Sequence, residues 1–300
     1  MKPDRPIIIT GATGLLGHAL CRIALDQGPI IGIYHIHKPI CQGGHWIHLD
    51  LTDATALADC IRTAQPGAVI HAAAVAQTGR CQSRDAATEA INVTVPGQLA
   101  DICADLGIPM AFTSTDLVFD GSQPPYNEDS PPSPLSVYGE QKARAEALVL
   151  DRWPEALVCR MPLMMGAAPH ADTNFTVQML TAIATGQPVT LFHDEFRTPV
   201  DIWSAARGIA QFLGHQNGVI HLGGHRRVSR LEIGMAAARY MGIAPTMIRS
   251  ASAAVYSNGA PRALDCSLDS QRAFKLGYTP DDYEQGMQRT IDHWIKLRRR

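Results

Sequence analysis

The stretch Thr10-Gly11-Ala12-Thr13-Gly14-Leu15-Leu16-Gly17 decides the fold of this chain. It ends a short apolar, β-branched run at residues 6–10, typical of a buried parallel strand, and it precedes a stretch with the apolar spacing of a helix. Gly11 permits a tight turn, Gly14 lets the backbone approach a pyrophosphate, and Gly17 lets the helix pack closely on the strand. The free N–H groups at the start of the helix bind phosphates. Strand, glycine turn and helix in this order predict a dinucleotide-binding site.

The first half of the chain continues this alternation of strands and helices. Further strands are predicted at residues 29–34, 45–49, 67–71, 108–113 and 156–160. Helices are predicted at residues 52–63, 87–106 and 138–150. Alternating strands and helices of these lengths predict an α/β fold with a doubly wound parallel sheet, whose ligand lies across the carboxyl ends of the strands.

The second half is less regular. Helices are predicted at residues 174–185, 202–213 and 229–241, and short strands at residues 189–191 and 219–221. We expect residues 1–165 to form the dinucleotide-binding domain, with residues 196–225 returning to it. Residues 166–300 are expected to form mainly a smaller α/β domain that binds the substrate.

Composition limits the class of protein. The 300 residues are 46% hydrophobic and carry a formal charge of −2, which favours a globular protein without a broad basic face for nucleic acid. The apolar runs are too short to cross a membrane, no signal peptide is evident, and the basic run at residues 296–300 is interpreted as a solvated tail. Seven cysteines without a Cys-x-x-Cys motif indicate reduced thiols and a cytoplasmic protein.

Tyr138 and Lys142 are the main candidates for chemistry. They lie four residues apart on a predicted helix, which places their side chains on one face. A phenol titrates near ~10, and an ammonium beside it brings the pKa of the phenol toward neutral pH. Because this spacing is common by chance, the pair gains its meaning from the dinucleotide site.

Small or polar residues follow three of the predicted strands. These segments are Asp50-Leu51, His71-Ala72-Ala73-Ala74 and Ser114-Thr115-Asp116. The first combines a carboxylate with an apolar side chain, which suits an adenine. The alanines of the second would let a cofactor lie against the backbone. We expect the three segments to share one edge of the sheet with the glycine turn, because the carboxyl ends of parallel strands meet there.

These residues resemble those of the extended short-chain dehydrogenase/reductases. The matching positions are residues 10–17, Asp50-Leu51, residues 71–74, Asn92, Ser114-Thr115, and Tyr138 with Lys142. Within this superfamily the chain is most similar to the dTDP-4-dehydrorhamnose reductases and to the related regulatory beta subunits of methionine adenosyltransferase. The narrower resemblance lies in Ser-Thr-Asp-Leu-Val-Phe-Asp-Gly at 114–121 and in residues 134–139, 197–199 and 261–265. It covers essentially the whole chain and implies a Rossmann sheet.

The resemblance implies a role for each candidate residue. Tyr138 would donate a proton to a carbonyl oxygen as hydride arrives from a nicotinamide. Lys142 would lower the pKa of the phenol and hydrogen-bond the nicotinamide ribose, and Thr115 would hold and polarise the carbonyl oxygen. Asn92 is expected to order Lys142 through water or backbone, with a helix-surface polar residue as the alternative. The implied cofactor contacts are Gly11, Thr13, Gly14, Leu15, Leu16, Gly17, Asp50, Leu51, Ala72, Ala73, Ala74, Asn92, Tyr138 and Lys142.

The end of the second predicted strand bears on the choice of cofactor. An acidic residue there selects NAD, whereas basic residues favour the 2′-phosphate of NADP. His35, His37 and Lys38 occupy this end without a carboxylate and favour NADPH, with NADH as the alternative. Zinc ligation by His35, His37, His45 and His48 is disfavoured because the segment fits a strand and a cofactor loop, so no metal is predicted.

The second half supplies the expected substrate site. Asn174-Phe175 lies where related enzymes contact a sugar nucleotide. Arg197 and Arg262 are candidates to bind a diphosphate, because a guanidinium gives it bidentate hydrogen bonds; a surface salt bridge is the alternative. Arg262 is favoured because it follows a flexible stretch at residues 257–260 that could cover a pocket. The expected substrate contacts from the first half are Ser114 and Asp116.

Leu117 departs from the Ser-Thr-Asp-Tyr-Val-Phe sequence common among the reductases. It also speaks against a 4,6-dehydratase, in which the glutamate base follows Thr-Asp. The resemblance therefore implies an NADP-dependent reductase of a nucleotide-linked 4-keto sugar, with dTDP-4-dehydrorhamnose, in dTDP-rhamnose biosynthesis, as the leading substrate. A cofactor-binding regulatory subunit and a sugar-nucleotide epimerase are the alternatives, and a homodimer is left open.

Overall fold

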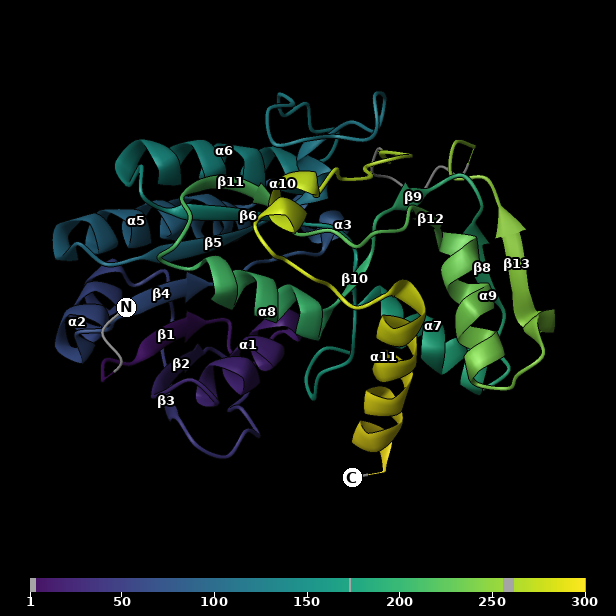
Figure 1. Ribbon diagram of the computed structural model, residues 1–300, viewed down its shortest axis with the longest axis horizontal. Helices are drawn as coiled ribbons and strands as arrows, with labels where there is room; N and C mark the ends of the chain where they lie inside the picture. Colours follow the sequence, from purple (N-terminus) through teal and green to yellow (C-terminus); the bar gives the residue numbers. More distant parts are fainter. Residues whose placement is uncertain (1–3, 173, 256–261, 300) are drawn as a thin grey trace.

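The computed structural model describes residues 4–172, 174–255 and 262–299, and its centre is a seven-stranded sheet (Figure 1). Every strand pairing in this sheet is parallel. In spatial order the strands are β11 (Gly218–His221), β6 (Leu157–Met161), β5 (Met110–Thr115), β4 (Ala68–His71), β1 (Ile7–Thr10), β2 (Ile30–Tyr34) and β3 (His45–His48). The predicted α/β fold with a doubly wound parallel sheet is confirmed.

Helices cover both faces of the sheet (Figure 1). One face carries α1 (Leu15–Leu25) and α8 (Ile202–Phe212), and the other carries α2 (Ala54–Ala64), α5 (Val95–Leu106) and α6 (Val137–Arg152). Leu20 and Ile209 are in the core on the first face, and Leu99 and Val149 are in the core on the second. Because both faces of the sheet are buried at its centre, β1, β2 and β4 are nearly continuous apolar runs, whereas the edge strand β3 is partly exposed.

Strand β11 comes from the second half of the chain but lies beside β6 at one edge of the sheet. Its register places Ile220 opposite Cys159. Helix α8, which precedes it, packs against α1 (Figure 1). Helix α8 and strand β11 thus lie with the central sheet, whereas β9 at residues 196–197 pairs with β12, and the predicted domain bounds stay a prediction.

A smaller α/β region lies to one side of the sheet (Figure 1). Its helices are α7 (Phe175–Ala184), α9 (Arg230–Tyr240) and α11 (Tyr283–Arg298). Its strands pair as β8 (Val189–Phe192) with β13 (Ile248–Ala251), and β9 (Phe196–Arg197) with β12 (Val228–Ser229). The short pair β7 (Met164–Met165) and β10 (Val200–Asp201) leads into it. Leu180, Ile233 and Met287 belong to its separate apolar core.

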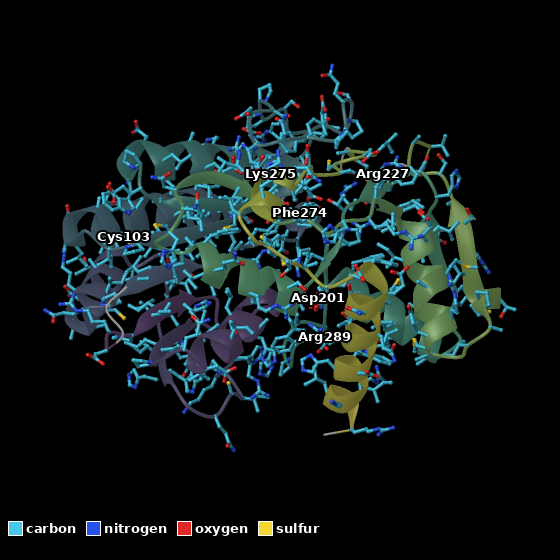
Figure 2. All side chains as sticks on the ribbon, in the orientation of Figure 1. Cys103, Asp201, Arg227, Phe274, Lys275 and Arg289 are labelled. Atoms are coloured by element: carbon cyan, nitrogen blue, oxygen red, sulfur yellow. The ribbon has the colours of Figure 1, made fainter. Side chains whose placement is uncertain are left out.

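Helix α11 is absent from the sequence predictions. Its residues Met287 and Trp294 are buried in the core of the smaller region. Arg289, on another side of this helix, forms a 3.5 Å ion pair with Asp201 at the start of α8 (Figure 2). Lys296 and Arg298 are exposed, in agreement with the interpretation of the basic C-terminal run as solvated, but they form the last turn of α11, where positive charge is favourable, and not a free tail.

The helix predicted at residues 87–106 is interrupted. It consists of α4 (Ala86–Glu89), a π-helical turn (Ala90–Thr94) and α5. Pro96 lacks the N–H that would bond the carbonyl four residues earlier, which favours a wider turn at this point. The remaining short helices are α3 (Thr78–Cys81), η2 (Asp116–Val118), η3 (Pro245–Met247) and α10 (Gln271–Lys275). Across the described ranges, no helix is both long and apolar enough to cross a membrane.

Candidate active site

The glycine turn between β1 and α1 makes close backbone contacts. Gly11 has a φ of +67°, and a Cβ at this position would lie 2.7 Å from the backbone nitrogen of Ala73. A Cβ on Gly17 would overlap the carbonyl oxygen of Gly11. Gly14 is exposed and caps α1, so the free N–H groups of the first helical turn are open to an anion. The turn therefore fits a pyrophosphate at its backbone, whereas the side chain of Leu16 is buried in the core.

The ends of β1 and β4 are joined by a buried polar contact. The hydroxyl of Thr10 lies 2.7 Å from Nδ1 of His71, and the backbone N–H of Ala73 donates to the same hydroxyl at 3.4 Å. Burial, with the charge of Lys142, lowers the pKa of His71 to about 3, so this imidazole is neutral. The contact holds the β4 segment in place, where Ala72 and Ala73 are half-buried and Ala74 is exposed.

The predicted adenosine end of the site is exposed at the end of β2. His35, His37 and Lys38 are all exposed, and His37 stacks on His170 with ring centroids 4.4 Å apart. The carboxylate of Asp50 instead accepts hydrogen bonds from Thr52 within the next turn. Leu51, the other predicted adenine contact, is buried in the sheet core.

Asn92 lies in the π-helical turn and is fully buried. Its Oδ1 accepts a 2.9 Å hydrogen bond from the N–H of Val75, and its Nδ2 donates to the carbonyl of Val75 at 3.1 Å. Nδ2 also donates to Oε1 of Gln141 at 2.8 Å. These contacts attach the loop after β4 to the side chain of Gln141, which precedes Lys142, and Asn92 is buried and not at the helix surface, while its ordering of Lys142 stays a prediction.

The start of α6 brings Tyr138 and Lys142 to the end of β5. The side chain of Ser136 caps the helix by accepting a hydrogen bond from the N–H of Gly139. A Cβ at Gly139 would overlap the carbonyl oxygen of Leu117, so glycine allows the helix to approach the segment after β5. Tyr138 and Lys142 are both buried, and Nζ of the lysine lies 3.9 Å from the centroid of the Phe112 ring.

The pKa values of this pair correct one expectation. Burial raises the pKa of Tyr138, and Cys81 and Asp116 raise it further, whereas a lowered value was expected from Lys142. Burial also lowers the pKa of Lys142 to about 7, against the opposing effect of Glu146. The reason is that removal from water penalises the charged form of both groups. Tyr138 is therefore a protonated phenol at neutral pH, the form that can donate a proton.

Thr115 is the last residue of β5. Its hydroxyl lies 3.2 Å from Oδ1 of Asp116 and accepts a 3.3 Å hydrogen bond from the N–H of Leu117. Ser114 is buried, and within the described ranges its hydroxyl has no hydrogen-bond partner. The carboxylate of Asp116 is buried between Thr115 and Arg197. Its effect on the site is therefore to hold these two side chains in place.

A cleft of about 320 Å³ lies where the segment after β5 meets the start of α6. Leu117 and Ser136 contribute to its wall from the sheet side, and three arginines line it from the smaller region: Arg197, Arg230 and Arg262. Arg197 is almost fully buried, in an ion pair of 3.1 Å with Asp116. The side chain of Arg262 is 37% exposed, with Glu195 at 3.3 Å. The stretch at residues 257–260 that was expected to cover this site lies outside the described residues.

Arg230 and Glu195 were missed by the sequence analysis. Glu195 is buried and contacts Arg230 at 2.9 Å, and the guanidinium of Arg230 lies 4.3 Å from the centroid of the Phe175 ring. Burial alone would raise the pKa of Glu195, but Arg230 and Arg197 outweigh it and lower this pKa. Pairing of β9 with β12 brings the two residues together, and no spacing in the sequence reports that pairing.

Asn174 and Phe175 lie at the start of α7. The side chain of Asn174 caps the helix by accepting a hydrogen bond from the N–H of Val177. Phe175 supports Arg230 through its ring face. The contacts of both side chains are thus structural, and direct contact with a substrate stays a prediction.

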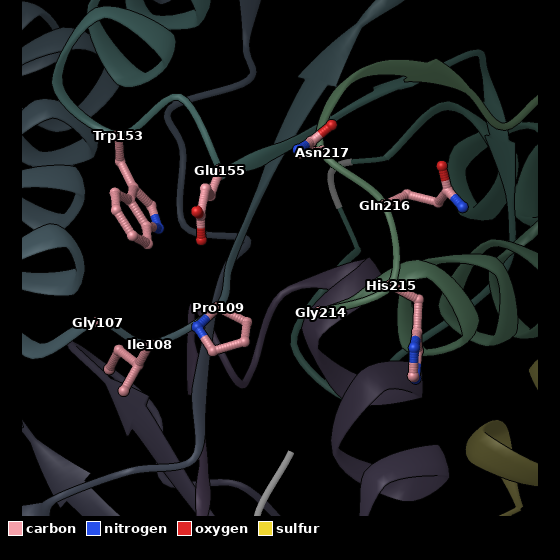
Figure 3. A pocket seen from close by; sticks show the side chains of 9 residues that line it. All are labelled: Gly107, Ile108, Pro109, Trp153, Glu155, Gly214, His215, Gln216 and Asn217. Carbon is pink, nitrogen blue, oxygen red and sulfur yellow. The ribbon is translucent and has the colours of Figure 1, made fainter.

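A second hollow, of about 290 Å³, lies at the opposite edge of the sheet (Figure 3). It is formed by the segments that precede β5, β6 and β11, and its lining residues are Gly107, Ile108, Pro109, Trp153, Glu155, Gly214, His215, Gln216 and Asn217. Since it lies at the amino ends of the strands, it is remote from Thr115, Tyr138 and the glycine turn.

The fold and the residues at the carboxyl edge define an extended short-chain dehydrogenase/reductase, a class of NAD(P)-dependent oxidoreductases. The chain belongs to the family described as RmlD substrate binding domain, whose sequence pattern matches residues 5–295.

Known relatives agree with this assignment. The chain is 31% identical over 269 residues to a probable low-salt glycan biosynthesis reductase of Haloferax volcanii, covering 87% of this chain and 88% of the relative. It is 28% identical to methionine adenosyltransferase 2 subunit beta of Xenopus laevis, covering 92% and 83%. The structure of a hypothetical dTDP-4-dehydrorhamnose reductase from Sulfolobus tokodaii superimposes with a TM-score of 0.82 at 27% identity, covering 94% and 98%.

Proposed function

We propose that this protein is an NADPH-dependent reductase of a nucleotide-linked 4-keto sugar, and that its substrate is dTDP-4-dehydrorhamnose. The observation that carries the proposal is the arginine-lined cleft, whose wall includes Leu117, two residues after Thr115, and Ser136, two residues before Tyr138. A nucleotide-linked sugar needs a site for its diphosphate next to a site for its carbonyl, and the arginines of the cleft and the Thr115–Tyr138 segment are the candidates for the two. Its similarity to reductases supports the same reaction.

The cofactor residues fit a nicotinamide dinucleotide. Bound NADPH would supply the hydride. The glycine turn and the start of α1 would bind its pyrophosphate, and His35, His37 and Lys38 favour a 2′-phosphate at the exposed end of β2. NADH remains the alternative, to be separated by comparing kcat/KM for the two cofactors.

The residues of the chain would divide the chemistry between them. Tyr138, protonated at neutral pH, would donate its proton to the carbonyl oxygen as negative charge develops there. The Thr115 hydroxyl would hydrogen-bond the same oxygen and orient it. Arg262 and Arg230 would bind the diphosphate, and Arg197 would support them from its buried ion pair with Asp116.

Two alternatives come from different classes. The similarity to a methionine adenosyltransferase subunit favours a cofactor-binding regulatory protein, and a sugar-nucleotide epimerase would use the same tyrosine. Leu117, in place of the common tyrosine at the cleft wall, is the feature that weakens the choice of dTDP-4-dehydrorhamnose.

The test is NADPH oxidation, followed by absorbance, in a coupled assay that generates the dTDP-4-dehydro-6-deoxy sugar. We expect turnover by the wild-type protein. NADPH binding without turnover of this or related keto sugars would favour the regulatory subunit, and conversion without net NADPH consumption would favour the epimerase.

Cellular setting and assembly are part of the same proposal. All seven cysteines are free, and six of them are buried, which supports a protein of the reducing cytoplasm. Association into a homodimer is tested by size-exclusion chromatography with light scattering.

A further inference from the structure

Helix α6 carries another buried ionisable residue one turn beyond Lys142. Glu146 lies on the same face as Tyr138 and Lys142, because the three are spaced by four residues. Its carboxylate is buried and accepts hydrogen bonds from Nε and Nη2 of Arg160, at 3.1 and 2.8 Å. Arg160, on β6, is also buried. Neither Glu146 nor Arg160 is among the residues that line the arginine cleft.

We infer that Glu146 and Arg160 are positioning residues that together set the charge of Lys142. The carboxylate stabilises the buried ammonium, and the guanidinium limits how strongly it does so. This inference rests on the oxidoreductase function proposed above, in which the charged lysine serves the nicotinamide ribose and the phenol.

The surroundings of Lys142 show why a distant carboxylate matters. The ammonium lies against the ring of Phe112, and a ring face is a weak partner for a fully buried charge. A carboxylate one helical turn away in a medium of low polarity exerts a stronger field than the same group would in water. The pKa of Lys142 responds in this way, since burial lowers it and Glu146 raises it.

The other ionisable groups around Lys142 and Tyr138 contribute little net charge. His71, on β4, is neutral because burial lowers its pKa to about 3. Cys81, on α3, stays a thiol because burial raises its pKa. Asp116, on η2, is paired with Arg197. Tyr138, on α6 itself, is protonated.

Arg160 is likewise held by uncharged neighbours apart from Glu146. Its Nη1 lies 3.4 Å from Nε2 of His221, and burial lowers the pKa of that imidazole to about 3. Its guanidinium also lies over the ring of Phe119, 5.1 Å from the centroid. Lys142, Glu146 and Arg160 thus form a series of three charges, and the next neighbour, His221, is neutral. Loss of the Arg160 charge should therefore change the pKa of Lys142.

The test is a direct titration of the lysine. The chain has only five lysines, so ¹³Cε-lysine NMR of the cofactor-free protein gives few signals, and Lys142→Met assigns the one of interest. We expect wild-type Lys142 to titrate near pH 7. Glu146→Gln should lower its midpoint by about one pH unit, because the stabilising charge is lost. Arg160→Gln should raise it, because the carboxylate is no longer neutralised.

The control is Glu140→Gln on the same helix. The side chain of Glu140 is 40% exposed and pairs with Arg84, so its removal should leave the titration of Lys142 unchanged. Glu146→Asp should return the midpoint toward the wild-type value. Should Glu146→Gln fold poorly, the double variant Glu146→Gln/Arg160→Gln removes both charges and should titrate between the two single variants.

The midpoint of the Lys142 titration should shift in opposite directions in Glu146→Gln and Arg160→Gln. A pair with only a structural role would not give this result. Shifts of the same sign, or none, with loss of stability in both variants, would overturn the inference. The alkaline limb of kcat/KM should move with the NMR midpoint in each variant. Opposed NMR shifts in a protein without turnover would refute the proposed reductase and leave the inference standing.

Discussion

The two ends of the candidate active site bury charged groups in opposite ways. At the proton-delivery end, Lys142 lies against an aromatic ring, and burial lowers its pKa to about 7. At the anion-binding end, Arg197 is buried to a similar degree, but Asp116 and Glu195 lie 3.1 and 3.6 Å away. Burial would lower the pKa of Arg197, and these carboxylates more than offset it. The comparison shows that burial shifts the pKa of a basic group toward neutral pH only where no carboxylate lies in direct contact with it.

The largest expected effect is at the proton-delivery end. Tyr138→Phe removes the proton donor but keeps the ring, so kcat should fall roughly 10³-fold with little change in NADPH affinity. NADPH oxidation and fluorescence titration measure the two quantities. Tyr240→Phe, at an exposed position on α9, is the matched control. Retention of a tenth or more of wild-type turnover would show that another group delivers the proton.

Replacement of the buried ammonium should separate stability from activity. The unfolded chain keeps the proton of Lys142 up to a pH of about 10.4, while the folded chain loses it near pH 7. The folded state is therefore penalised in full below pH 7, and the penalty disappears as the pH rises toward 10. Lys142→Met should raise the free energy of unfolding at pH 6 by on the order of a few kcal/mol, and less at pH 9.

Thermal and denaturant unfolding at the two pH values measure this gain, and turnover should be lost in the same variant. Lys275→Met, at an exposed position, should change neither. A variant less stable than wild type at pH 6 would mean that a counter-ion closer than Glu146 pairs with Lys142 in solution, and the contrast between the two ends would fail.

At the anion-binding end the effect should appear in binding. Arg262→Gln removes the most exposed guanidinium of the cleft, so KM for the nucleotide sugar should rise about tenfold while kcat changes little. Steady-state kinetics measure both, and Arg239→Gln, on the exposed side of α9, is the control. A fall in kcat with unchanged KM would place Arg262 in the chemistry and not in diphosphate binding.

The smallest effect is expected at Leu117, in the wall of the arginine-lined cleft. Leu117→Tyr restores the hydroxyl common in the reductases, and one added hydrogen bond should lower KM for dTDP-4-dehydrorhamnose by roughly two- to tenfold. Leu135→Tyr, also at the cleft wall, is the control. A higher KM for this sugar would point to a different substrate, for which leucine is the better neighbour.

The two ends also differ in how far the sequence predicts them. The glycine turn, Thr115, Tyr138 and Lys142 follow from local spacing and from the alternation of strands and helices. Arg230 and Glu195 depend on pairing between strands that are far apart in the chain, which no local pattern encodes.

Other differences have physical causes of the same kind. The direction of the Tyr138 pKa depends on three-dimensional burial, which a helical spacing cannot report. The 16-residue helix α11 was missed because charged residues surround its buried positions. Asp50 follows its strand as expected, but its carboxylate accepts hydrogen bonds from Thr52.

The late arrival of β11 at the sheet has a consequence for synthesis of the chain. Strand β6 is complete at residue 161, but its outer edge has no partner until residues 218–221 have been made. During translation, this strand, which is buried throughout in the folded protein, would present open backbone groups, and α1 would lack the cover of α8. A fragment ending near residue 165 should therefore aggregate when expressed alone, whereas one that extends beyond β11 has its sheet edge protected.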